Sequence, residues 1–115
     1  MNYFQSALGI ALVLCTSTTA LAERVLVPSD PKATYDIEVM DVGQGKSALF
    51  VVGKRVGPSG TSFTAREVNC VNATFRYMGE GDTFDEMKAN INDRASMAPL
   101  VEGSISYYIV QAACN

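Results

Sequence analysis

The sequence predicts an α+β fold, in which a small antiparallel β-meander of about four strands packs with a short helix and a C-terminal helix. Two observations support this prediction. Apolar and polar residues alternate with period two in segments that are separated by very short connections, and such connections favour antiparallel neighbouring strands. After the last of these segments, helix-start signals and apolar residues at helical spacing replace the alternation.

Residues 1–22 resemble an export signal peptide, which is not part of the fold. Leu8–Leu14 is apolar but shorter than the roughly 20 residues that a transmembrane helix needs. The small residues of Ala20–Ala22 place a cleavage site directly before Glu23. The alternative is a lipoprotein whose Cys15 carries a lipid anchor, but the large residue before Cys15 disfavours membrane anchoring. We therefore expect an exported bacterial protein of the periplasm, the cell surface or the extracellular space.

Residues 23–33 are expected to be an extended lead-in arm, and residues 34–115 a single α+β domain. Pro28 and Pro31 keep the arm out of regular structure, although Arg24–Val27 fits a short edge strand.

The four main strands follow the alternating pattern. They are expected at Thr34–Met40, Ala48–Arg55, Thr61–Cys70 and Ala73–Met78. Ala48–Val52 is a continuous apolar run, which is typical of a strand covered on both faces. Glycine and proline predict a loop at residues 56–60, and Val71-Asn72 fits a tight turn.

Two helices follow the strands. Thr83 and Glu86 form a capping box, in which each side chain satisfies a free backbone N–H at the helix start. Apolar residues recur at helical spacing from Phe84 onward, and asparagines keep this helix short. An irregular return over Ala95–Val101 leads to the C-terminal helix, whose N-cap is Ser104.

The composition excludes several kinds of chemistry. The 115 residues contain no histidine and no tryptophan, and the net charge is −3. A Cys–His catalytic pair and a Cys/His zinc site are therefore excluded, and a nucleic-acid partner is not indicated. Gly45-Lys46-Ser47 resembles the end of a phosphate-binding loop, but the motif's first glycine is missing and a strand follows, so we expect a simple turn. We predict no catalytic residue, no cofactor and no metal ligand.

Two groups of charged residues invite a catalytic reading. Arg66, Glu67 and Arg76 lie in the predicted strands, and we interpret them as the solvated face of the sheet. The second group consists of Glu80, Asp82, Asp85 and Glu86. Its spacing does not match a calcium loop, and negative charge is favourable in a first helical turn. An enzyme working with carboxylates alone would need two of them in one pocket with separated pKa values.

Cys70 and Cys114 remain once the signal peptide is removed. An even number of cysteines in an oxidising compartment predicts a disulfide between them. The bond would close a loop of about 45 residues, which stabilises a fold by roughly 4 kcal/mol in the chain-entropy model. The alternatives are two free thiols or pairing between chains.

The C-terminal half of the chain resembles the surface-adhesin protein E family of small exported bacterial proteins. Arg66–Cys70 and Thr74–Tyr77 are similar to the family's charged strand that ends in a cysteine and to the Arg/Tyr-bearing strand after it. Pro99, Gly103-Ser104 and the ending Ala113-Cys114 are similar to the segment around the last helix. The resemblance implies an antiparallel sheet packed against a C-terminal helix, stapled by this disulfide and often dimeric. The family's named adhesin binds matrix proteins and haem, which we do not carry over because this chain has no histidine.

From these features we expect a non-enzymatic exported module that binds an unidentified protein partner or is associated with the cell envelope. Small sheets with uncovered edges tend to pair, so a homodimer is a related expectation. The first alternative is an inhibitor or regulator that presents the 56–60 loop. The second is the carboxylate-only enzyme.

Overall fold

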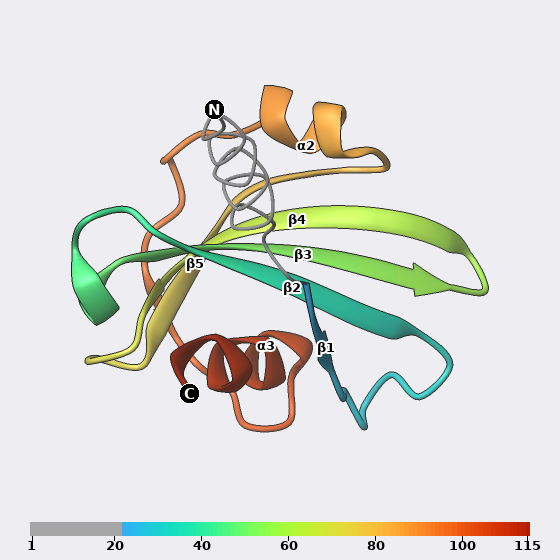
Figure 1. Ribbon diagram of the computed structural model, residues 1–115, viewed down its shortest axis with the longest axis horizontal. Helices are drawn as coiled ribbons and strands as arrows, with labels where there is room; N and C mark the ends of the chain where they lie inside the picture. Colours follow the sequence, from blue (N-terminus) through green and yellow to red (C-terminus); the bar gives the residue numbers. More distant parts are fainter. Residues whose placement is uncertain (1–21) are drawn as a thin grey trace, which may run out of the picture.

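A meandering antiparallel sheet with one helix on each face makes up the fold (Figure 1). The computed structural model describes residues 22–115, so nearly all of the predicted export signal, including Cys15, lies outside the described residues. The strands are β1 (Glu23–Val25), β2 (Thr34–Asp41), β3 (Leu49–Gly57), β4 (Gly60–Asn69), β5 (Thr74–Gly81) and β6 (Ala98–Pro99). The helices are η1 (Gly45–Ser47, a 3-10 turn), α2 (Phe84–Ala89) and α3 (Ile105–Cys114).

The six strands lie side by side in chain order, and every neighbouring pair is antiparallel. The predicted α+β class agrees with this architecture, whereas the prediction of about four strands is too low. One added strand is β1, in the residues expected to be an arm. The other is β6, in the return Ala95–Val101 that was expected to be irregular, where Pro99 lies at an edge and needs no ladder bond on its outer side.

Strand β3 runs through the middle of the sheet and is covered on both faces, as its apolar run predicts. Val51 faces the layer under α3, and Val52 faces the layer under α2. Both side chains are buried. Figure 1 shows α2 above and α3 below the sheet.

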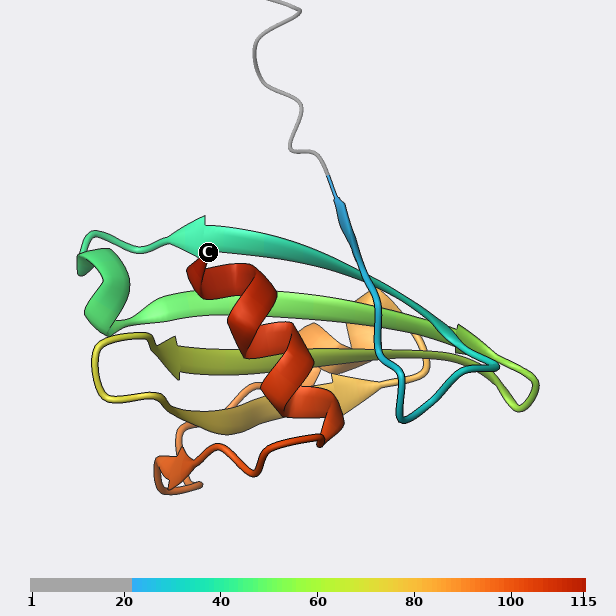
Figure 2. The ribbon, with the colours of Figure 1, turned by 90° about the horizontal axis from the view of Figure 1, so that it is seen from below.

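The larger core lies between the sheet and α3, which crosses the sheet diagonally (Figure 2). Ser104 caps the helix, since its Oγ accepts a hydrogen bond from the Tyr107 N–H at 3.2 Å, as the sequence predicts. Ile109, Val110 and Ala113 then bury their side chains in this core. The sheet contributes Ile37, Leu49, Val51 and Val68.

The smaller core lies under the short helix α2, where Met87 packs on Val52 and Ala65. The predicted capping box is present with one difference. Thr83 Oγ1 accepts from the Glu86 N–H at 3.1 Å, but Glu86 Oε1 accepts from the N–H of Asp82 at 2.8 Å.

Glycines in β5 let α2 approach the sheet closely. A Cβ on Gly79 would lie 2.9 Å from the carbonyl oxygen of Met87, and one on Gly81 would lie 2.5 Å from the Cβ of Glu86. The register of β4 and β5 shifts in the same region, because Tyr77 faces Arg66 while Gly79 faces Ala65. One extra β5 residue between them forms a β-bulge.

The predicted loop at residues 56–60 is wrong. Strands β3 and β4 stay paired out to Gly57 and Gly60, so only Pro58 and Ser59 remain in the turn. Gly60 has a φ of +124°, a value that glycine adopts without strain. None of the helices in residues 22–115 is long and apolar enough to cross a membrane.

Candidate functional site

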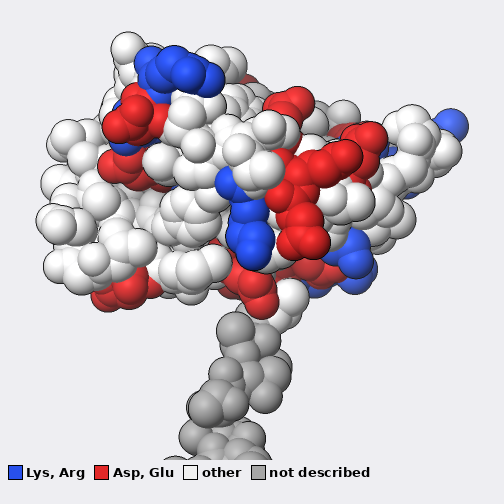
Figure 3. Space-filling model, turned by 90° about the horizontal axis from the view of Figure 1, so that it is seen from above, with Lys and Arg blue, Asp and Glu red and all other residues white. Residues whose placement is uncertain are grey.

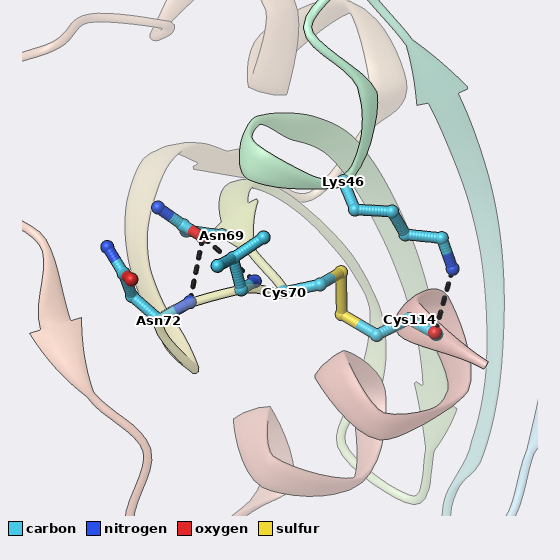
Figure 4. The surroundings of a disulfide bond; sticks show 6 residues. Lys46, Asn69, Cys70, Asn72 and Cys114 are labelled. Atoms are coloured by element: carbon cyan, nitrogen blue, oxygen red, sulfur yellow. Dashed lines mark hydrogen bonds between the residues drawn. A yellow bond between two sulfur atoms is a disulfide. The ribbon is translucent and has the colours of Figure 1, made fainter.

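The predicted disulfide joins Cys70, directly after β4, to Cys114 at the end of α3 (Figure 4). The two Cα atoms are 5.6 Å apart. Lys46 lies beside the bond: its Nζ donates to the Cys114 carbonyl oxygen, and its own carbonyl accepts from the Cys70 N–H, both at 2.8 Å. The disulfide therefore holds the end of α3 against the sheet, and it indicates an oxidising location for the protein.

The turn after Cys70 is organised by Asn69. Its side-chain oxygen accepts from the N–H groups of Val71 and Asn72, at 2.9 and 3.0 Å (Figure 4). This Asx turn fixes the β4–β5 hairpin next to the disulfide, so Asn69 has a structural role.

The four carboxylates near α2 do not form one site. Glu86 caps the helix and Asp85 lies 4.0 Å from Lys88. Glu80 instead pairs in register with Thr64 and lines a cavity on the α3 side of the sheet. Within residues 22–115, no group of three or more acidic or cysteine side chains could hold a metal ion.

The interpretation of Arg66, Glu67 and Arg76 as a solvated face is wrong. The Arg66 side chain is buried, with 3% of its surface exposed. Glu67 and Arg76 form an ion pair at 2.6 Å, and both side chains are mostly buried. Arg66 lies two residues before Val68 on one strand, so the alternation itself places it on the core face. The alternation of residues along this strand therefore indicates that Arg66 is buried.

Two salt bridges fix the first two strands. Arg24 on β1 pairs with Asp36 on β2 at 2.6 Å, and this hydrogen bond lowers the pKa of the Asp36 carboxyl. Asp30, in the turn between the strands, pairs with Arg55 at 2.8 Å and accepts from the Tyr35 hydroxyl at 2.6 Å. Both hydrogen bonds lower the pKa of the Asp30 carboxyl, and the one from Arg55 has the larger effect.

One segment of the sheet edge stays open. β1 pairs only with Tyr35–Ile37 of β2, so the rest of that strand, Glu38–Asp41, has no neighbour on its outer side among residues 22–115. We call Glu38–Asp41 the open edge. The unpaired N–H and C=O groups of an edge strand form a template for a further strand. In Figure 2, the open edge is the part of β2 beyond its crossing with β1.

The opposite edge of the sheet is covered. β6 pairs with Thr74 and Phe75 only, but the chain between α2 and β6 follows the rest of β5. The Asn92 N–H donates to the Met78 carbonyl at 2.8 Å, and the Asn90 side chain donates to the Glu80 carbonyl at 2.8 Å. No such cover exists for the open edge within the described residues.

The open edge combines apolar and acidic side chains. Val39 and Met40 are about two-fifths exposed, and Glu38 and Asp41 flank them. A groove of about 450 Å³ adjoins it on the α2 face. Its lining includes Val42, Phe50, Glu67 and Met78. Figure 3 shows that the end of this face towards η1 is largely uncharged, with both acidic and basic atoms at its margins.

The sequence contained one indication of this edge. The strand expected within Arg24–Val27 is shorter than the strand expected at Thr34–Met40. If the two strands pair, the shorter one leaves part of the longer one without a partner on the side where they meet.

Comparison of the chain with protein-family models, curated proteins and solved structures finds no match. The resemblance to the surface-adhesin protein E family therefore stays a prediction.

Proposed function

We propose that this protein is an exported, non-enzymatic binding module that adds an extended segment of a partner protein to its sheet at the open edge. The observation that carries the proposal is the mismatch between β1 and β2, which leaves Glu38–Asp41 unpaired among residues 22–115 while the β5 edge is covered. In this mode of recognition, backbone hydrogen bonds provide affinity and pockets for alternate side chains provide specificity.

The chemistry of the open edge defines the partner. A strand placed beside it would direct alternate side chains to the α2 face, next to Met40 and the groove that contains Phe50. Opposite charges across neighbouring strands stabilise pairing. The segment that fits best therefore carries apolar residues opposite Val39 and Met40, flanked by lysine or arginine opposite Glu38 and Asp41.

A second copy of the chain fits this edge less well. A two-fold antiparallel pairing sets residues of the same sheet face opposite each other, so Glu38 lies opposite Met40 or Val42 of the other copy, and Asp41 lies opposite Val39 or Ile37. Neither acidic side chain then meets a basic one, whereas a heterologous segment supplies the opposite charges that stabilise a strand pair. We therefore propose a heterologous partner in preference to the homodimer that the sequence suggested. Light scattering at neutral pH tests this choice: a monomer supports it, and a stable dimer would favour the homodimer instead.

The disulfide supports the proposed location in the periplasm or at the cell surface, because such bonds persist in oxidising compartments. A rigid scaffold also suits the proposed role, since an edge that is already ordered loses little conformational freedom when a segment binds.

Charge reversal at the edge tests the function. The double variant Glu38→Lys/Asp41→Asn keeps the acceptor that Asp41 offers to the Gly43 N–H. We expect this variant to bind a short synthetic peptide with lysine-flanked apolar residues about tenfold more weakly than the wild type, and a glutamate-flanked peptide more tightly.

The matched control changes the charge by the same amount elsewhere. Asp93 and Glu102 are exposed, and their side chains form no ion pair with any residue of the described part of the chain. The variant Glu102→Lys/Asp93→Asn should bind both peptides as the wild type does. Equal weakening in both double variants would mean that only net charge matters, and the proposal would be wrong.

A further inference from the structure

A second feature, independent of the open edge, is a cavity of about 170 Å³ between the sheet and the first turns of α3. Its inner wall contains Gly53, Arg66 and Ile109, all buried. Its outer wall contains Arg55, Ser62 and Glu80, which are partly or fully exposed. The cavity therefore has a mouth towards solvent and a buried floor. Its volume corresponds to about five or six water molecules.

The guanidinium of Arg66 lies at the floor of this cavity with only neutral partners. Its Nε donates to Ser106 Oγ at 3.1 Å, its Nη1 to Thr64 Oγ1 at 2.8 Å and its Nη2 to Tyr77 Oη at 3.4 Å. It also lies 4.8 Å from the centre of the Tyr77 ring. A guanidinium has five N–H donors, so two have no protein partner within the described residues.

A buried cation is normally paired with an anion. No carboxylate of residues 22–115 lies within 4.0 Å of the Arg66 nitrogens. The other arginine at the cavity, Arg55, is neutralised by Asp30. Two charges at the cavity remain without an oppositely charged partner among residues 22–115: the cation of Arg66 at the floor and the anion of Glu80 at the mouth. Within the same residues, the Glu80 side chain makes no ion pair or hydrogen bond.

We propose that this cavity binds a small zwitterion, an α-amino acid with a short side chain. Its carboxylate accepts from the two free N–H groups of Arg66, because a guanidinium recognises a carboxylate in bidentate geometry. Its ammonium group faces Glu80. Ile105 and Ile109 form the apolar part of the wall and contact the side chain. A simple anion would meet the repulsion of Glu80, which is the reason for choosing a zwitterion.

Gly53 keeps the floor of the cavity open. A Cβ at this position would lie 3.3 Å from Thr64 Oγ1, 3.5 Å from Arg66 Nη1 and 3.6 Å from Ile109 Cδ1. The backbone there is ordinary extended strand, so alanine is compatible with the fold. The variant Gly53→Ala therefore narrows the cavity without changing any charge.

Titration of the full chain with glycine, alanine, acetate and methylammonium tests the proposal, with the NMR signal of the Arg66 Nε–H and calorimetry as readouts. We expect glycine and alanine to shift the Arg66 signal and to saturate below about 10 mM, and the two singly charged probes to bind more weakly. Equal binding of acetate and glycine, or no shift with any probe, would overturn the proposal.

Two variants and a control sharpen the result. Glu80→Gln should weaken glycine binding about fivefold and leave acetate binding unchanged or stronger. Gly53→Ala should weaken the binding of alanine more than the binding of glycine, because alanine has the additional methyl group. Glu102→Gln, a matched exposed change away from the cavity, should have no effect. If Glu80→Gln behaved like Glu102→Gln, the assignment of the ammonium group would be wrong. Variants of the open edge leave these measurements unchanged, so the two proposals fail separately.

Discussion

Lys46 and Cys114 are joined by a hydrogen bond of 2.8 Å from the Lys46 Nζ to the Cys114 carbonyl oxygen, next to the disulfide that ends α3. The last turn of α3 is therefore held at two points, one covalent and one polar. Both contacts come from segments that lie at the same end of the sheet, because Cys70 also donates its N–H to the Lys46 carbonyl.

The disulfide provides most of this attachment. We expect the double variant Cys70→Ser/Cys114→Ser to lose about 4 kcal/mol of unfolding free energy, since the bond closes a long loop in the unfolded chain. Urea unfolding monitored by circular dichroism measures the loss. Lys46→Met is the control and should lose about 1 kcal/mol or less, because it removes one exposed hydrogen bond. Similar losses in both variants would contradict this account.

The hydroxyl of Ser106 is needed by the buried arginine. Ser106→Ala removes the acceptor of Arg66 Nε and the partner of the Tyr77 hydroxyl, and we expect a loss of about 1–3 kcal/mol. Thermal and urea unfolding measure this loss. Ser29→Ala, in an exposed turn, is the matched control and should change stability little. Equal unfolding free energies for Ser106→Ala and Ser29→Ala would mean that the hydrogen bonds around Arg66 do not stabilise the fold.

The glycines of β5 determine how closely α2 packs. Gly81→Ala would bring the new Cβ to 2.7 Å from the Met87 backbone nitrogen, so the helix must shift. We expect a loss of about 1–3 kcal/mol and faster hydrogen exchange in Phe84–Ala89. Gly57→Ala is a suitable control for the exchange of α2, because the Cβ there meets the guanidinium of Arg55 and no atom of α2. Equal exchange rates in both variants would contradict the close packing of α2.

Acid should weaken the turn at Asp30. The pKa of this carboxyl is lower in the folded protein than in the unfolded chain, mainly because Arg55 donates to it. Its contribution to stability is therefore complete above the unfolded pKa, near 4, and is lost as the pH falls through the folded pKa. The stability difference between wild type and Asp30→Asn should shrink below about pH 4. A difference for Asp30→Asn that stays constant between about pH 7 and about pH 2 would refute the assignment.

The elements with strong local signals were predictable from sequence. Thr83 and Ser104 mark the two helix starts because their side chains satisfy local backbone N–H groups. The burial of β3 on both faces follows from its continuous apolar run. The cysteine pair was predictable because removal of the predicted export signal would leave two thiols in an oxidising compartment.

Features that depend on distant pairing were not predictable. The segment 56–60 has loop composition, yet strand pairing continues through Gly57 and Gly60 and leaves a short turn. β6 has only two residues and forms because the chain returns beside Thr74 and Phe75. The alternation along β4 places Arg66 on the core face, but its charge favours solvent, and the three hydroxyl groups from β4, β5 and α3 that make its burial tolerable cannot be read from the sequence. These hydroxyls meet only in the folded protein.

Binding of an extended partner segment as an added strand should protect the backbone of the open edge. Amide hydrogen exchange by NMR, with and without a saturating peptide of lysine-flanked apolar residues, measures this protection residue by residue. We expect exchange to slow at Glu38–Asp41, and we expect the Glu38→Lys/Asp41→Asn variant to abolish this protection. Peptide binding without slower exchange at Glu38–Asp41, or protection confined to another part of the sheet, would contradict strand addition at the open edge.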